Sequence, residues 1–177
     1  AVILLVVGLG VFMNKASGPS KYDAFAQSLS SSGAKFYGAF WCPHCQAEKA
    51  LFGSAKQYLP YVECSNPDNT MTQVCLDNKI ESFPTWRFKD PISVESKGTP
   101  IVCAVAPGVA GESDICKRIA SKYDRTWVFP EYKSFSIKSS VDPIKDGTTW
   151  KFPATASFSG EVPLEILARQ IKFTLPQ

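Results

Sequence analysis

Apolar residues recur at helical spacing in two early segments of the chain. In residues 21–34 they return every three or four positions until Gly33, and they do so again between Cys42 and Leu59. These patterns predict two amphipathic helices, the second of which ends at Pro60. The intervening residues 35–41 (KFYGAFW) favour strand structure, so we expect a buried strand there.

Strand and helix patterns continue to alternate as far as residue 88. Residues 61–64 (YVEC) predict a short strand, and residues 71–79 (MTQVCLDNK) predict a short helix. Residues 80–88 (IESFPTWRF) predict a strand that the chain enters through Phe83-Pro84-Thr85. This order is typical of an α/β fold, in which helices cover the faces of a sheet.

The pattern is irregular between Asp90 and Asp146, where Pro, Gly, Ser and Lys are frequent. Its periodic parts, and those that follow it, predict a helix at 111–123, strands at 125–129, 134–138, 148–152 and 154–161, and a helix at 163–171. We therefore expect residues 90–147, here called the middle segment, to be an insertion. The domain that receives it would consist of residues 16–89 and 148–177.

The N-terminal residues AVILLVVGLGVFM form an apolar run that precedes Asn14-Lys15. A helix that spans a membrane needs roughly 20 apolar residues, so this run alone is too short. A buried N-terminal strand or helix is one interpretation. We favour another, in which residues 1–15 are the tail of a membrane anchor and everything after Lys15 lies outside the bilayer.

Composition adds little to this picture. The chain of 177 residues is 45% hydrophobic and 20% charged, as in ordinary globular proteins. Its net charge is +3, and Lys and Arg are scattered singly along it. The sequence contains no dense basic cluster of the kind that indicates nucleic-acid binding, so no nucleic-acid partner is expected.

Cysteine usage is more informative. The chain has six cysteines, and an even number behind an apolar N-terminal run indicates an oxidising compartment. Six cysteines allow 15 pairings, so the sequence alone does not define the disulfides. They fall into three sequential pairs: Cys42 and Cys45, Cys64 and Cys75, Cys103 and Cys116.

The motif Cys42-Pro43-His44-Cys45 follows a predicted strand and opens a predicted helix. A helix N-terminus stabilises an anion, so Cys42 should ionise more readily and act as the nucleophile. Cys45, one turn further on, should be the buried thiol that resolves a mixed disulfide. Pro43 would make the first turn rigid. His44 would stabilise the thiolate further and make the pair more oxidising. No cofactor other than this redox-active disulfide is implied.

Two other interpretations of the motif are weaker. A zinc site would need two more ligands at suitable spacing, and the sequence has no second CxxC and no second histidine. No metal site is therefore expected. A purely structural disulfide would close an unusually tight ring. The motif therefore favours a redox function.

Four blocks of the sequence, WCPHC, YVECS, FPTW and FSGEVPLEILARQ, resemble the thioredoxin-like domain associated with vitamin K epoxide reductase homologues and its membrane-anchored stand-alone relatives. The resemblance covers about residues 17–89 and 148–171. It implies a thioredoxin-like fold, a central mixed sheet flanked by helices, with Cys42 and Cys45 as the redox pair.

The resemblance also implies roles for residues outside the redox pair. Cys64 and Cys75 would form a supporting disulfide. Pro84 would be a cis-proline facing the CPHC motif and would expose the Phe83 backbone to an incoming peptide, although a trans proline at a strand start is the alternative. Trp41, Pro43 and Phe83 would then contact the substrate.

The middle segment departs from the usual domain and carries two more cysteines. Cys116 precedes Trp127 by the same interval as Cys75 precedes Trp86, so we expect a second structural disulfide between Cys103 and Cys116. An electron relay that connects one of these pairs to the redox pair is the alternative.

These observations predict a membrane-anchored thiol–disulfide oxidoreductase that faces an oxidising compartment, either the periplasm or cell exterior or the thylakoid lumen. It would act on protein thiols and disulfides or with a membrane reductase related to vitamin K epoxide reductase.

The rival hypothesis is a structural or assembly subunit of a larger membrane complex. The aromatic residues of the middle segment would then serve docking, although we favour a small core of their own: Trp127, Phe129, Tyr132 and Phe135.

Overall fold

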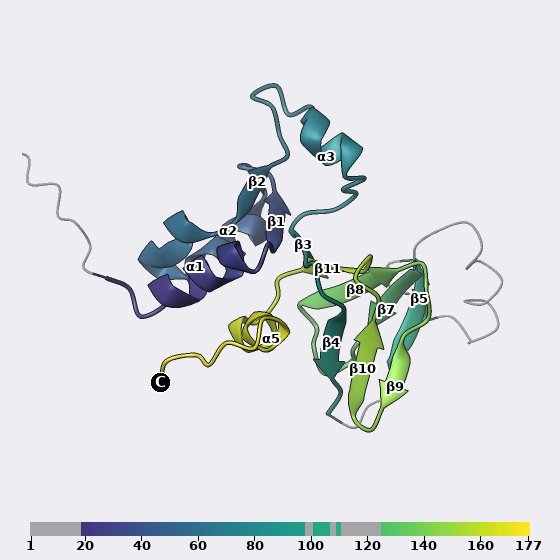
Figure 1. Cartoon of the computed structure of the whole chain (residues 1–177). Coiled ribbons are helices and arrows are strands. Elements are labelled where there is room, and N and C mark those ends of the chain that lie inside the picture. Colours follow the sequence, from purple (N-terminus) through teal and green to yellow (C-terminus); the bar gives the residue numbers. More distant parts are fainter. Residues whose placement is uncertain (1–18, 98–100, 107–108, 111–124) are drawn as a thin grey trace, which may run out of the picture.

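The protein has a mixed α/β fold that is compatible with a thioredoxin-like fold, as a computed structural model of the chain shows (Figure 1). The structure describes residues 19–97, 101–106, 109–110 and 125–177. Figure 1 shows α1 and α2 at the same end of the molecule as β1 and β2, whereas β5 and β7 to β10 lie at the other end.

The helices are short, and most of them precede or follow a strand. They are α1 (Asp23–Ser31), α2 (Pro43–Leu51), the 3-10 helix η1 (Gly53–Tyr58), α3 (Gln73–Asp77) and α5 (Leu164–Gln170). The strands are β1 (Lys35–Gly38), β2 (Tyr61–Glu63), β3 (Thr85–Arg87), β4 (Ile92–Glu95), β5 (Val102–Ala106), β6 (Val109–Ala110), β7 (Arg125–Val128), β8 (Phe135–Ser139), β9 (Ile144–Asp146), β10 (Thr149–Phe152) and β11 (Ser157–Gly160).

Eight strands form one mixed sheet in the order β2-β1-β3-β11-β8-β7-β5-β6. The β1–β2 pair is parallel, and the other pairs are antiparallel. Three consecutive residues of β1 are buried, as expected for a strand that is covered on both faces. The middle segment therefore does not interrupt the sheet but extends it beyond β11.

A second sheet of three antiparallel strands has the order β4-β10-β9. Strand β4 alternates strictly, with Ile92 and Val94 buried and the residues after each exposed, which is the pattern of a sheet with one solvated face. Phe152 of this sheet is 6.4 Å from Trp127 and 6.2 Å from Phe129 between ring centroids. The second sheet thus packs on the part of the large sheet that contains β7.

The hydrophobic core runs from one end of the molecule to the other. The rings of Phe36 on β1 and Trp86 on β3 stack at 4.6 Å. Phe158 on β11 is fully buried and makes edge contacts with Phe88 at 6.0 Å and Phe135 at 5.5 Å. Strand β11 therefore joins the core around β3 to the core around β8.

The aromatic residues of the middle segment belong to this core. Phe129 and Phe135 are buried, while Trp127 and Tyr132 are partly buried and pack against the core cluster. The small separate core expected for these rings is therefore not formed, because they pack into the same cluster as Phe36, Trp86 and Phe158.

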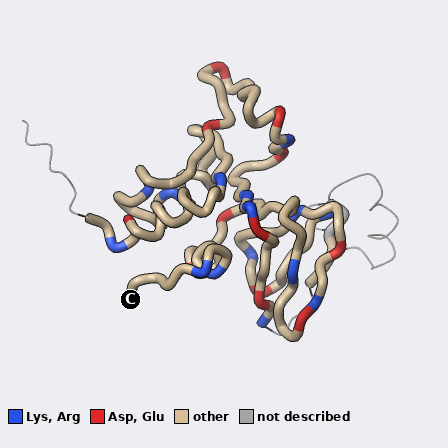
Figure 2. Tube along the Cα trace, viewed as in Figure 1, with Lys and Arg blue, Asp and Glu red and all other residues tan. Residues whose placement is uncertain are grey.

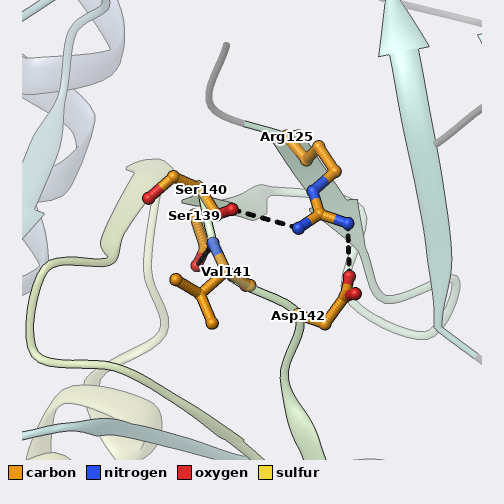
Figure 3. Close-up of polar contacts among 5 residues, drawn as sticks. All are labelled: Arg125, Ser139, Ser140, Val141 and Asp142. Atoms are coloured by element: carbon orange, nitrogen blue, oxygen red, sulfur yellow. Dashed lines mark hydrogen bonds and ion pairs between the residues drawn. The ribbon is translucent and has the colours of Figure 1, made fainter. Parts of the chain in front are cut away.

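Strand β7 begins at a buried charged residue, Arg125, which is 7% exposed. Figure 3 shows its guanidinium bonded to the Asp142 carboxylate and, at 3.0 Å, to the Ser140 carbonyl. The Ser139 hydroxyl donates to the Val141 carbonyl at 2.7 Å in the same loop. The ion pair and these hydrogen bonds fix the loop after β8. Elsewhere, charges of both signs are interspersed along the chain (Figure 2).

The structure corrects several sequence predictions. The helix expected to run to Leu59 ends at Leu51 and is followed by a 3-10 turn. Gly53 lies there at φ +56, a left-handed conformation that breaks an α-helix. The strand expected over residues 35–41 ends at Gly38, because the chain turns there toward the CPHC motif. Four strands were not predicted: β4, β5, β6 and β9.

Two predictions fall on residues outside the described ranges. They are the helix at 111–123 and the membrane-anchor tail at 1–15. Among the residues that the structure does describe, no helix has both the length and the apolar character needed to cross a bilayer.

Replacement of Phe158 by Ala should destabilise the fold by about 3–5 kcal/mol, the usual cost of deleting a fully buried ring. Chemical denaturation followed by tryptophan fluorescence measures this loss. Val141→Ala is the control, since Val141 is 54% exposed, and it should change the free energy of unfolding by less than about 0.5 kcal/mol. A loss below 1 kcal/mol in Phe158→Ala would contradict the role of β11 as the link between the two parts of the core.

Candidate active site

The CPHC motif lies where the sequence predicts it, at the start of a helix that follows a strand. Cys42 is the N-cap residue of α2, with an extended backbone at φ −76 and ψ 117, and Pro43 occupies the first turn. The Cys42 sulfur accepts a hydrogen bond from the Cys45 backbone N–H at 3.3 Å. This bond is the capping contact that a helix N-terminus offers to an anion, so the geometry suits a thiolate at Cys42.

Both cysteines of the motif are free thiols and both are buried. Cys45 is 1% exposed, as expected for a resolving thiol, but Cys42 is only 4% exposed although it was expected to be the outer residue. Burial is the largest cause that raises the pKa of Cys45, to about 12, and the hydrogen bond with Cys42 adds to it. Cys45 is therefore a protonated thiol at neutral pH.

The end of β2 and the loop after it hold the residues that precede the motif. One oxygen of Glu63 accepts hydrogen bonds from the backbone N–H groups of Phe40 at 3.1 Å and Ser65 at 3.0 Å. The Trp41 indole N–H donates to the Ser65 hydroxyl at 2.8 Å. Glu63 and Ser65 were not predicted as site residues, although both stand in the YVECS block.

The same loop is closed by a disulfide between Cys64 and Cys75, whose Cα atoms are 5.5 Å apart. The disulfide implied by the resemblance is thus present. Cys103 is also disulfide-bonded, and Cys116, its expected partner, lies outside the described residues.

Aromatic side chains lie next to the motif. Phe40 is 47% exposed and Trp41 is 50% exposed, and the Trp41 ring meets the edge of Phe83 at 6.0 Å. The Phe83–Pro84 peptide bond is cis. The structure therefore brings Trp41 and Phe83, two of the residues expected to contact a substrate, together beside the motif.

His44 contacts a residue that the sequence analysis did not identify. Its Nδ1 atom lies 2.7 Å from a carboxylate oxygen of Glu161, which is 117 positions away in the chain. Glu161 comes directly after β11, and the preceding residue, Gly160, donates its backbone N–H to the Pro84 carbonyl at 3.0 Å. No local pattern in the sequence indicates this pairing, because it depends on β11 lying beside β3.

A buried carboxyl group lies one turn beyond Cys45 on the same helix. Glu48 is fully buried and accepts hydrogen bonds from the Trp86 indole N–H at 3.1 Å and the Val162 backbone N–H at 2.9 Å. Burial raises the pKa of Glu48 to about 8, against the lowering effect of these two bonds, and the negative charge of Glu161 adds to the increase. Glu48 is therefore mostly protonated at neutral pH.

Within the described ranges, no group of three or more His, Cys, Asp or Glu side chains could hold a metal ion. What the site offers chemically is a pair of thiols two residues apart, one of them capped by a helix N-terminus. Such a pair can attack a disulfide and then resolve the mixed disulfide that results.

The fold and the site together define an α/β protein with a CxxC dithiol at a helix start. Comparison with known proteins agrees with this class. The chain is similar to the protein named thiol-disulfide oxidoreductase LTO1 from Arabidopsis thaliana, with 47% identity over 75 residues. The match covers 39% of this chain but only 20% of that protein. No protein-family model matches the chain. The similarity supports a thiol–disulfide oxidoreductase.

Glu48→Gln should remove a pH dependence of stability. The pKa of Glu48 is raised from an ordinary value near 4.5 to about 8, so the folded protein binds the proton more tightly than the unfolded chain. Wild type should therefore lose stability relative to the variant as the pH rises from about 4.5 to about 8, by at most about 5 kcal/mol in all.

Urea denaturation at several pH values measures this difference. Glu165→Gln, which replaces an exposed carboxyl group at the start of α5, is the matched control. A wild-type-minus-variant difference for Glu48→Gln that stays constant from pH 5 to pH 8 would contradict the buried-carboxyl assignment.

Proposed function

We propose that this chain is a protein thiol–disulfide oxidoreductase in which Cys42 is the nucleophile and Cys45 the resolving thiol. The observation that carries the proposal is the position of the two free thiols at the start of α2, with the Cys42 sulfur bonded to the Cys45 N–H. A sulfur at that position gains the stabilisation that makes a cysteine reactive.

The reaction is an exchange of two electrons. The Cys42 thiolate attacks one sulfur of a substrate disulfide, which forms a mixed disulfide and releases the other substrate sulfur as a thiolate. Cys45 loses its proton and attacks the Cys42 sulfur. The Cys42–Cys45 disulfide forms, the second substrate sulfur leaves, and the substrate has been reduced while the pair has been oxidised. The reverse sequence oxidises a dithiol substrate.

Three side chains near the dithiol would serve substrate recognition. The exposed Trp41 ring and the neighbouring Phe83 supply an apolar surface, and Pro43 stands next to the nucleophile on α2. His44, with its carboxylate partner Glu161, would adjust the charge next to Cys42. An extended substrate peptide would bind to the backbone of Phe83, next to the cis bond to Pro84.

The wider setting is also part of the proposal. The domain would consist of residues 16–89 and 148–177, with residues 90–147 as an insertion, and residues 1–15 would be the tail of a membrane anchor. The disulfide between Cys64 and Cys75 supports an oxidising compartment, either the periplasm or cell exterior or the thylakoid lumen. A membrane reductase related to vitamin K epoxide reductase would be the electron-transfer partner.

A second candidate function is a structural or assembly subunit of a membrane complex. The observation in its favour is that two apolar residues of the middle segment are exposed, Val141 at 54% and Ile144 at 71%. Such a subunit would bind its partners equally well without either thiol of the motif.

Cys42→Ser should abolish the reduction of insulin, because it removes the attacking sulfur. Cys45→Ser should still attack but should accumulate mixed disulfides that are visible on non-reducing gels, because no second thiol releases the substrate. Turnover of insulin by the purified variants measures both effects, with unfolding curves as the control for fold. Full activity in Cys42→Ser would contradict the enzymatic proposal and favour the assembly subunit.

The other cysteines should not turn over. Cys64 and Cys75 are separated by 11 positions, and closing a loop of that size stabilises a fold by about 3 kcal/mol. After mild reduction and alkylation, mass spectrometry should find label only on Cys42 and Cys45. Label on Cys103 or Cys116 that appears as early as on Cys42 would instead indicate an electron relay through the middle segment.

A further inference from the structure

The resolving thiol and an aromatic ring both lie over a position of β1 that only glycine allows. A Cβ atom on Gly38 would lie 2.8 Å from the Cys45 sulfur and 2.9 Å from the Tyr61 ring atom Cε2. Both distances are shorter than real side-chain contacts. The sulfur and the ring edge therefore both lie directly over the bare backbone of β1.

A lysine from the same helix as Cys45 covers the face of that ring. The Lys49 ammonium lies 3.2 Å from the centroid of the Tyr61 ring, a cation–π contact. Lys49 is four positions after Cys45, so the two side chains share one face of α2. The Tyr61 hydroxyl in turn donates to Glu63 at 3.1 Å. The ammonium is thus held on the Tyr61 ring, on the face of α2 that carries the buried Cys45 thiol.

The remaining charged groups around Lys49 come from two elements and from the motif itself. The pKa of Lys49 is lowered, chiefly by burial, to which Lys56 on η1 adds. Glu63 on β2 and the sulfurs of Cys45 and Cys42 oppose this lowering. Lys49 likewise lowers the pKa of Cys45, against the stronger effect of burial. The interaction between the ammonium and the buried sulfur is therefore favourable when Cys45 is ionised.

We propose that Lys49 is a positioning residue for the resolving step: its ammonium, held on the Tyr61 ring, stabilises the Cys45 thiolate as it attacks the mixed disulfide. The inference rests on the proposed function. In this step the Cys45 proton passes to solvent, the bond between the Cys45 and Cys42 sulfurs forms, and the bond between Cys42 and the substrate breaks. Lys49 keeps its proton throughout and supplies charge only.

The size of the effect follows from two opposing terms. If loss of the ammonium raises the thiol pKa by one unit, the thiolate fraction at a fixed pH falls tenfold. The nucleophilicity of the remaining thiolate rises about threefold, because thiolate reactivity increases with basicity with a slope of about 0.4–0.5. The net loss is about threefold per unit, so a rise of one to two units in the thiol pKa would slow the resolving step about three- to tenfold.

The two steps can be separated by stopped-flow reaction of the full chain, reduced at Cys42 and Cys45, with excess dithiobis-nitrobenzoate. Attack by Cys42 releases a first thionitrobenzoate at a rate proportional to the reagent. Resolution by Cys45 releases a second at a rate independent of the reagent. The measurement is made at several pH values from 5 to 8. Cys45 is protonated in this range, so the second phase is slow enough to be resolved.

Lys49→Met should slow the second phase three- to tenfold at each pH and should change the first phase by less than twofold. Lys49→Arg, which keeps the charge, should restore the wild-type second phase to within twofold. A plot of the second-phase rate against pH should shift to higher pH in Lys49→Met, but not in Lys49→Arg or Lys56→Met. Lys56→Met, which removes a lysine from the adjoining 3-10 helix, is the matched control and should leave both phases within twofold of wild type.

If the rate of the second phase in Lys49→Met is within 1.5-fold of the wild-type rate and the first phase is normal, the proposed role of Lys49 is wrong. The proposed function would not be affected by that result. Equal slowing in Lys49→Arg and Lys49→Met would also overturn the role of Lys49, since packing and not charge would then matter. Absence of the first phase in the wild-type protein would overturn the proposed function, and this inference with it.

Discussion

The close approach of helix α2 to strand β1 at Gly38 is the constraint on which the rest of the site depends. Only a residue without a side chain leaves room over the strand for both the Cys45 sulfur and the Tyr61 ring. Cys45 is 1% exposed at this close approach. Cys42 lies at the N-cap of the same helix, where its sulfur accepts the hydrogen bond of the Cys45 backbone N–H.

Two separate parts of the chain, both of which follow the motif in the sequence, then hold the start of α2. The end of β2 and the loop after it bind the residues before the motif through Glu63 and Ser65. The segment after β11 binds the motif and the helix through Glu161 and the Val162 backbone. The second set of contacts requires β11 to pair with β3, so the site is complete only when the chain has returned from the middle segment.

Local patterns were sufficient to predict the strand, the CPHC motif and the helix that follows, because these are contiguous and obey simple periodicity. They also gave β2, α3 and α5 to within a few residues. The same patterns could not predict Glu161, since its contact with His44 depends on strand order and spans 117 positions. They also missed β4 and β9, three or four residues long, whose pairing with β10 decides their structure more than their own composition does.

The buried face of α2 carries two acids that remain uncharged at neutral pH, since the pKa of Cys45 is raised to about 12 and that of Glu48 to about 8. Acids that are buried without an oppositely charged partner are more stable in their neutral form. Thiol–disulfide exchange nevertheless requires a negative sulfur at Cys45 for a moment. A positive charge near the sulfur would offset it, and the partly buried Lys49, whose ammonium lies on the Tyr61 ring, would supply that charge. The same burial that protects the thiol from unwanted reactions makes a nearby cation necessary for the wanted one.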